Sequence, residues 1–115
     1  MLEDCAKNYL QKSVATKPTI LGIDAQNLAF LFYRSGIIST TSMCNMGKTT
    51  HVVAAVGYDT TGDMPYWLIK NSFGPDWGED GYFKVEITNE WPGVCGVNYG
   101  AWAYPLTEAW PESTE

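Results

Sequence analysis

The spacing of apolar residues predicts one helix at the start of the chain and several strands after it. Five apolar positions recur every three or four residues, as on the buried face of an amphipathic helix: Leu2, Ala6, Tyr9, Leu10 and Val14. Lys17-Pro18 is expected to end this helix, because the residue before a proline disfavours helical geometry. The next apolar run, residues 19–24, is predicted to be a strand.

The middle of the chain alternates between apolar runs and polar breaks. Residues 29–33 are densely apolar and fit either a helical turn or a strand, and Ser35-Gly36 would turn the chain after them. Residues 39–50 are rich in hydroxyl groups, so we expect a surface loop. Residues 51–58 carry small apolar side chains almost without interruption, which predicts a buried strand.

Two more strands are expected beyond that point. Residues 60–63 would form a hairpin turn, and residues 65–70 the returning strand, with its proline at the edge. A glycine-punctuated loop, 73–81, leads to an alternating strand at 82–87, and a further aromatic segment covers 95–104. The pattern as a whole predicts a strand-rich antiparallel domain.

Composition and charge exclude several classes of function. A chain of 115 residues is long enough for one small core, and 45% apolar and 14% aromatic content is too high for a disordered polymer. The net charge is −6 and no Lys/Arg cluster exists, so we expect no nucleic-acid or membrane partner.

With three cysteines, no CxxC pair and one histidine, we expect neither a metal nor another cofactor. The simplest interpretation of three cysteines is one disulfide and one free thiol. A disulfide indicates an oxidising compartment.

His51 and Asn71 are the candidate chemical groups. His51 opens one predicted strand and Asn71 follows the next, so a hairpin would bring both to the same end of the sheet. The asparagine carbonyl could accept a hydrogen bond from one imidazole nitrogen and leave the other for a nucleophile. Taken alone, however, a histidine is more often structural, and Asn71-Ser72 is better explained as a turn.

A family resemblance changes this assessment. The segments HVVAAVGY (51–58) and YWLIKNSFG (66–74) resemble the histidine and asparagine signatures of the papain-like cysteine proteases, a family that includes the cathepsin L-like enzymes. Residues 30–37 resemble the stretch that precedes the histidine in this family. The similarity continues through three shorter motifs, 77–83, 93–96 and 103–105. The resemblance covers roughly residues 3 to 106.

The resemblance implies a fold and an activity. The fold would be α+β, an antiparallel β-rich half-barrel that forms the right-hand domain of the papain-like fold, with a short N-terminal helix. Residues 1–106 would be the C-terminal half of a peptidase domain and 107–115 an acidic tail. The activity would be hydrolysis of peptide bonds in peptide or protein substrates by a Cys-His-Asn mechanism. The location would be lysosomal, vacuolar or secreted, although the first five residues do not resemble a signal peptide.

The resemblance also assigns roles to individual residues. His51 would be the general base that forms an ion pair with a cysteine thiolate, and Asn71 would orient its ring. Phe73 stands where the family usually has a tryptophan that shields the histidine–asparagine hydrogen bond from water. Because phenylalanine is smaller, we expect the hydrogen bond between His51 and Asn71 to be more exposed to water. Trp77 matches a second tryptophan, near the part of the cleft that holds the leaving portion of the substrate. Val52 aligns roughly with the pocket for the substrate residue two before the cut.

Two glycines and two cysteines complete the comparison. Gly22 and Gly100 align roughly with the same pocket as Val52, although close backbone packing in a strand explains them equally well. Cys44 and Cys95 match a family disulfide. Cys5, on the helical stripe, is expected to be a buried, inert thiol.

The nucleophile of the family is not found in this chain. The Cys-Gly-Ser-Cys-Trp type of motif and the oxyanion-hole glutamine are absent, and none of the three cysteines has the surroundings to replace the nucleophile. We therefore expect this chain alone to be inactive and to require an N-terminal half that carries the cysteine, or to cover its exposed face by self-association. A non-catalytic module that binds peptides or proteins and a scaffold or storage protein are the alternatives.

Overall fold

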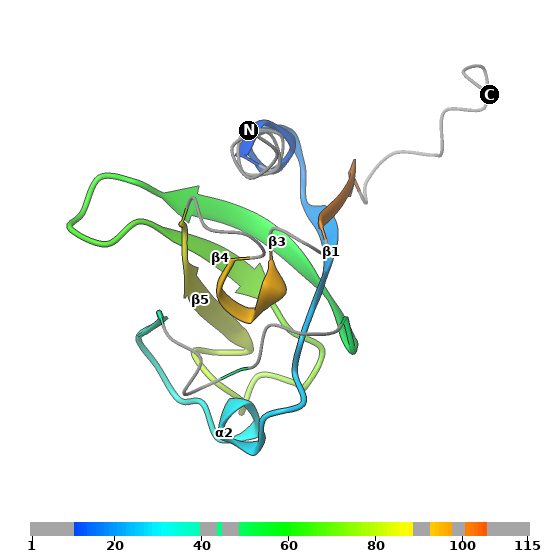
Figure 1. Cartoon of the computed structure of the whole chain (residues 1–115), viewed down its shortest axis with the longest axis vertical. Helices are drawn as coiled ribbons and strands as arrows, with labels where there is room; N and C mark the ends of the chain where they lie inside the picture. The colour runs from blue at the N-terminus through cyan, green and yellow to red at the C-terminus, as the bar shows by residue number, and fades with distance from the viewer. Residues whose placement is uncertain (1–10, 40–43, 45–48, 89–92, 98–100, 106–115) are drawn as a thin grey trace.

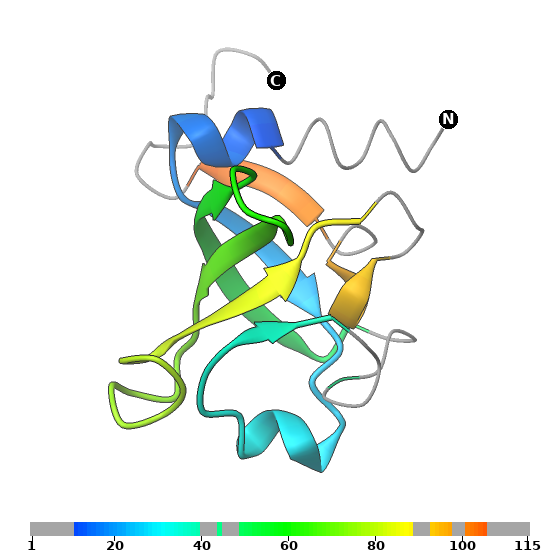
Figure 2. The same cartoon turned by 90° about the vertical axis from the view of Figure 1, so that its left-hand side faces the viewer.

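The computed structural model describes residues 11–39, 44, 49–88, 93–97 and, for the backbone only, 101–105 (Figure 1). A helix at residues 11–16 comes first. The elements that follow are β1 (Thr19–Ile23), α2 (Leu28–Leu31), β2 (Ile37–Ile38), β3 (His51–Asp59), β4 (Tyr66–Lys70), β5 (Tyr82–Glu86), the 3-10 helix η1 (Val94–Gly96) and β6 (Ala101–Pro105). The helix at 11–16 and α2 lie at opposite ends of the molecule (Figure 2).

One six-stranded sheet organises the described part of the chain, in the order β2-β5-β4-β3-β1-β6. Every neighbouring pair is antiparallel except β2 and β5, which run parallel. The β-rich prediction is therefore confirmed, with one parallel edge pair that the pattern did not predict. That pair is only two residues long on the β2 side, which is too short to show in a sequence pattern.

Local sequence explains where the helical segments begin and end. The helix at 11–16 stops before Pro18, as predicted, and its residue Val14 is buried. The other members of the predicted apolar stripe, and Cys5, lie outside the described residues. In the run 29–33 the helical alternative is correct, because the Asn27 side chain caps α2 by accepting a hydrogen bond from the Ala29 N–H. In the part of the chain that the structure describes, no helix has the length and apolarity to cross a membrane.

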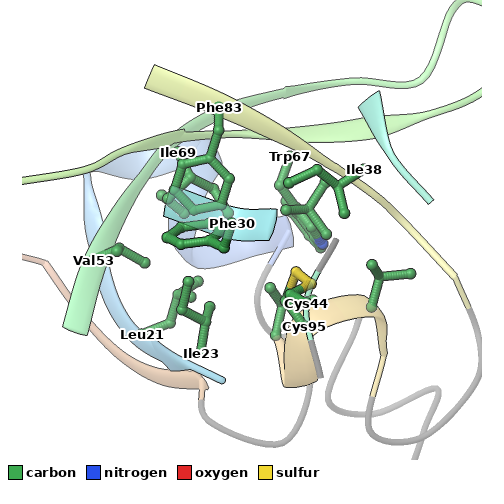
Figure 3. Close-up of a cluster of buried hydrophobic side chains, with 14 of the residues drawn as sticks. Leu21, Ile23, Phe30, Ile38, Cys44, Val53, Trp67, Ile69, Phe83 and Cys95 are labelled. Atoms are coloured by element: carbon green, nitrogen blue, oxygen red, sulfur yellow. A yellow bond between two sulfur atoms is a disulfide. The ribbon is translucent and has the colours of Figure 1, made fainter. Parts of the chain in front are cut away.

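The core lies on one face of the sheet and centres on Phe30 of α2. The Phe30 ring meets the Phe83 ring of β5 edge-on at 5.1 Å, a favoured aromatic geometry (Figure 3). The Cys44–Cys95 disulfide forms as the family resemblance implied and belongs to the same buried cluster. The helical turn α2 is thus held against the sheet by one large side chain, while its other residues face outwards.

Candidate active site

The β3–β4 hairpin places the two candidate residues together. Ala54 pairs with Lys70, so His51 at the start of β3 and Asn71 just after β4 lie at the same end of the sheet. His51 Nε2 and Asn71 Oδ1 are 2.7 Å apart, within hydrogen-bond distance. The arrangement expected from the sequence, a histidine whose ring is held by an asparagine side chain, is present in the structure.

The hydrogen bonds around Asn71 fix the proton on the imidazole. The Ser72 backbone N–H donates to Asn71 Oδ1 at 2.7 Å, and this donation identifies the atom that faces His51 as the amide oxygen. An amide oxygen only accepts, and His51 must therefore donate from Nε2. In the neutral ring this leaves Nδ1 with a free lone pair that can take a proton from a nucleophile.

Aromatic rings surround the His51 ring. The Phe73 ring lies 5.1 Å from the imidazole at an interplanar angle of 31°, and Phe30 approaches its edge at 6.5 Å. Phe73 is itself 40% exposed. Asn71 is only 4% exposed, so the acceptor of the pair is buried while the ring that covers the imidazole remains partly open to solvent.

Trp77 lies next to Phe73 in the loop between β4 and β5. Its ring contacts Phe73 at 5.4 Å and Phe30 at 5.1 Å, and its indole N–H donates to the Leu31 carbonyl at 3.1 Å. This hydrogen bond joins the loop to α2. Trp77 also lines a pocket of about 250 Å³ together with residues of two segments: Leu31, Phe32, Tyr33, Arg34, Asp76 and Gly78.

Val52 lies on the face of the sheet opposite the core and is 50% exposed. It lines an apolar depression of about 320 Å³ whose other walls are Ile20, Val53, Ala54, Lys70, Asn71 and Ser72. Gly22 pairs with Val52 across β1 and β3 but does not line this depression. The Thr49 side chain packs directly against Gly22 instead. Gly100 lies outside the described residues.

Substituting Gly22 with alanine is expected to destabilise the fold by at most about 1 kcal/mol relative to Gly57→Ala, because the Thr49 side chain that it displaces is exposed and can turn away. A Cβ at this position would overlap the Thr49 methyl group, and Thr49 precedes His51 by two residues. The measurement is urea unfolding of the two proteins. Gly57→Ala on β3 is the matched control, because a Cβ there meets no atom within 4 Å. Equal losses in the two variants would contradict this explanation.

The segment that enters β3 is anchored on both sides. The Thr50 N–H donates to the Ile23 carbonyl at 2.9 Å, and the Thr50 hydroxyl accepts from the Ala25 N–H at 2.9 Å. The Asp24 N–H donates to the Cys95 carbonyl, also at 2.9 Å. The end of β1 therefore connects the disulfide to the residue immediately before His51.

Sequence reasoning did not single out Phe30, Thr50 or Glu79 as contributors to this site. Phe30 was recognised only as part of an apolar run and of the 30–37 stretch, and its contact with His51 depends on the long-range packing of α2. Thr50 fell in the stretch predicted to be a loop. Glu79 contacts the Gly36 backbone, 43 residues away in sequence, and no local pattern signals such a contact.

With this geometry established, comparison with known proteins identifies the family. The sequence profile of the papain family cysteine proteases matches residues 2–104. The chain belongs to this family.

Its relatives include plant cysteine proteases. The chain is 43% identical to Zingipain-2 of Zingiber officinale over 98 residues, and this alignment covers 84% of this chain and 42% of that protein. It is 41% identical to Vignain of Ricinus communis over 105 residues, and this alignment covers 90% of this chain and 28% of Vignain. The chain thus spans less than half the length of these two relatives.

Solved structures agree with this assignment. The bromelain protease of Ananas comosus, solved in complex with the E64 inhibitor, superposes with a TM-score of 0.72 at 29% identity over 83% of this chain and 43% of that one. The Amb a 11 cysteine protease of ragweed pollen, solved in its proform, gives a TM-score of 0.70 at 32% identity, over 83% of this chain and 28% of that one. The half-barrel fold expected from the family resemblance is confirmed.

Proposed function

We propose that this chain is the histidine- and asparagine-bearing half of a cysteine endopeptidase. His51 is the general base and Asn71 the residue that orients it. The observation that carries this proposal is the 2.7 Å hydrogen bond from His51 Nε2 to Asn71 Oδ1, which leaves Nδ1 as the proton acceptor. His51 would accept the proton of a cysteine thiol and pass it to the leaving amine, while the thiolate attacks the peptide carbonyl carbon and water then hydrolyses the resulting thioester.

The surroundings of the pair support a place in a substrate cleft. Val52 and Phe73, 50% and 40% exposed, flank His51 and leave apolar surface at this edge of the sheet. We propose that the depression beside Val52 is this chain's wall of the pocket for the substrate residue two before the cut. Trp77 would lie on the leaving-group side, where its neighbouring pocket is lined by the side chains of Arg34 and Asp76.

The nucleophile and the oxyanion donors would come from an N-terminal half. The buried Cys44–Cys95 disulfide fits a lysosomal, vacuolar or secreted location, where disulfides persist. Without the other half, the pair formed by His51 and Asn71 has no thiol to activate, and we expect no peptidase activity.

Complementation tests this proposal. The chain is refolded alone and together with the part of Zingipain-2 that precedes the matched region, and each preparation is assayed with a fluorogenic peptide. We expect turnover only from the one-to-one complex. The complex made with His51→Ala is the control for contaminating protease. Binding without turnover would favour the alternative of a non-catalytic module that binds peptides or proteins.

A further inference from the structure

Glu79 joins two segments that are far apart in sequence. Its Oε2 accepts a hydrogen bond from the Gly36 N–H at 2.7 Å and lies 3.4 Å from the Tyr33 hydroxyl oxygen. Its Oε1 lies 3.2 Å from Lys84 Nζ on β5. The Tyr33 hydroxyl also donates to the Gly36 carbonyl at 2.6 Å. One carboxylate therefore links the segment after α2 to the loop that precedes β5.

That loop carries the side chains that cover His51. It begins after Asn71, contains Phe73 and Trp77, and closes where the Asn71 N–H donates to the Gly81 carbonyl at 3.0 Å. Asp80, which follows Glu79, has a φ of +58°, a conformation that costs a non-glycine residue energy. Asp80 and Gly81, whose φ is +94°, form a two-residue turn that is closed by reciprocal backbone hydrogen bonds between Glu79 and Tyr82 at 2.9 and 3.0 Å. The turn fixes the place at which the Glu79 side chain leaves the loop.

A continuous set of aromatic contacts runs from Glu79 to the imidazole. The Tyr33 ring, whose hydroxyl meets Glu79, packs against Trp77 at 5.3 Å. Trp77 packs against Phe73 at 5.4 Å, and Phe73 lies over His51 at 5.1 Å. A shift of the loop relative to the Tyr33 segment would therefore move the ring that shields His51.

The electrostatics of Glu79 favour its charged form. Partial burial acts to raise the pKa of Glu79, but the Gly36 N–H and the Lys84 ammonium outweigh it and hold the pKa below its ordinary value of 4.5. Burial and then the Glu79 charge raise the pKa of Tyr33 to about 12, so its hydroxyl remains a donor at neutral pH. Because the pKa of Glu79 is lowered on folding, its stabilising effect is present above pH 4.5 and lost as the pH falls through the folded-state value.

We propose that Glu79 is a positioning residue for His51, acting by clamping the 71–81 loop to the segment 33–36 and so holding Phe73 over the imidazole. The effect of Glu79 on catalysis rests on the function proposed above for His51. The contacts by which Glu79 holds the loop against the segment 33–36 are made within this chain and do not depend on that function. The clamp can therefore be tested without activity, and its failure would leave the assignment of His51 and Asn71 untouched.

The test follows the proton on His51 Nε2, which is unambiguous because the chain has a single histidine. Proton exchange with water is measured by NMR on ¹⁵N-histidine-labelled chain, for the unmodified protein and Glu79→Gln. We expect exchange to accelerate about tenfold in Glu79→Gln, since a hydrogen bond to a charged group typically contributes this much to a local opening equilibrium. Glu86→Gln on β5 removes the same charge outside the clamp and should leave the exchange rate unchanged.

Thermal melting of each variant separates local from global effects. Faster exchange in Glu79→Gln at a temperature where the protein remains folded supports the clamp. An unchanged rate, or an equal acceleration in Glu86→Gln, would overturn it. If Glu79→Gln fails to fold, Lys84→Met decides, because it removes the ammonium that meets Oε1, together with its contact over the Tyr66 ring, and leaves the Gly36 hydrogen bond in place. Acceleration in that variant supports the proposal, and an unchanged rate overturns it.

Discussion

Replacing His51 with alanine in the assembled enzyme is expected to lower kcat/KM by on the order of 10⁵- to 10⁶-fold, as loss of the base in a comparable catalytic unit does. The thiol then has no partner to accept its proton, and the leaving amine has no acid. Asn71→Ala should lower kcat/KM by a smaller factor, on the order of 10⁴-fold, because the base is still present but its ring is no longer held in place.

Hydrolysis of a fluorogenic peptide measures both losses, with the concentration of each assembled complex taken from native mass spectrometry. Tyr58→Phe, at the far end of β3, is the control for changes to the strand itself. A His51→Ala complex that keeps more than about a hundredth of the activity would be incompatible with a general-base role, which is worth at least 10²-fold.

Removing the disulfide is expected to destabilise the fold by about 4 kcal/mol, the chain-entropy value for a loop of this size. Cys44 and Cys95 are 51 residues apart, and both are fully buried in the core. The double variant Cys44→Ser/Cys95→Ser is compared with the unmodified chain by urea unfolding, with and without reductant. Reductant should destabilise only the unmodified chain. If the double variant unfolds at the same urea concentration as the oxidised protein, the disulfide contributes no stability.

This disulfide also bears on the site. The Asp24 N–H donates to the Cys95 carbonyl, and the Ile23 carbonyl accepts from the Thr50 N–H next to His51. Loss of the covalent link would therefore loosen the entry into β3 as well as the core. We expect the double variant to lose activity at temperatures where it remains folded.

The elements that the sequence predicted well are those with a strong local signal. The strand of residues 51–58 corresponds to β3, and Pro18 marks the end of the first helix, because small apolar runs and prolines act within a few residues. The approach of His51 to Asn71 followed from a single hairpin, the simplest long-range contact to predict.

Features that depend on packing between distant segments were not predictable in this way. Residues 29–33 fitted a helix or a strand equally well. The helix forms because Asn27 caps it and because Phe30 is buried in the core. The packing of Thr49 over Gly22 likewise depends on two separate segments. Glu79 lies within the motif 77–83, but its contact with Gly36 spans 43 residues and no local pattern signals it.

The most direct test of the central proposal is covalent labelling of the assembled complex with a thiol-reactive epoxide, read by the intact mass of each chain. We predict one label on the N-terminal chain, none on this chain, and strong suppression of labelling in the His51→Ala complex, because the imidazole is needed to generate the thiolate. A label on one of this chain's own cysteines, or labelling that is indifferent to His51, would contradict the assignment of this chain as the base-bearing half of the enzyme.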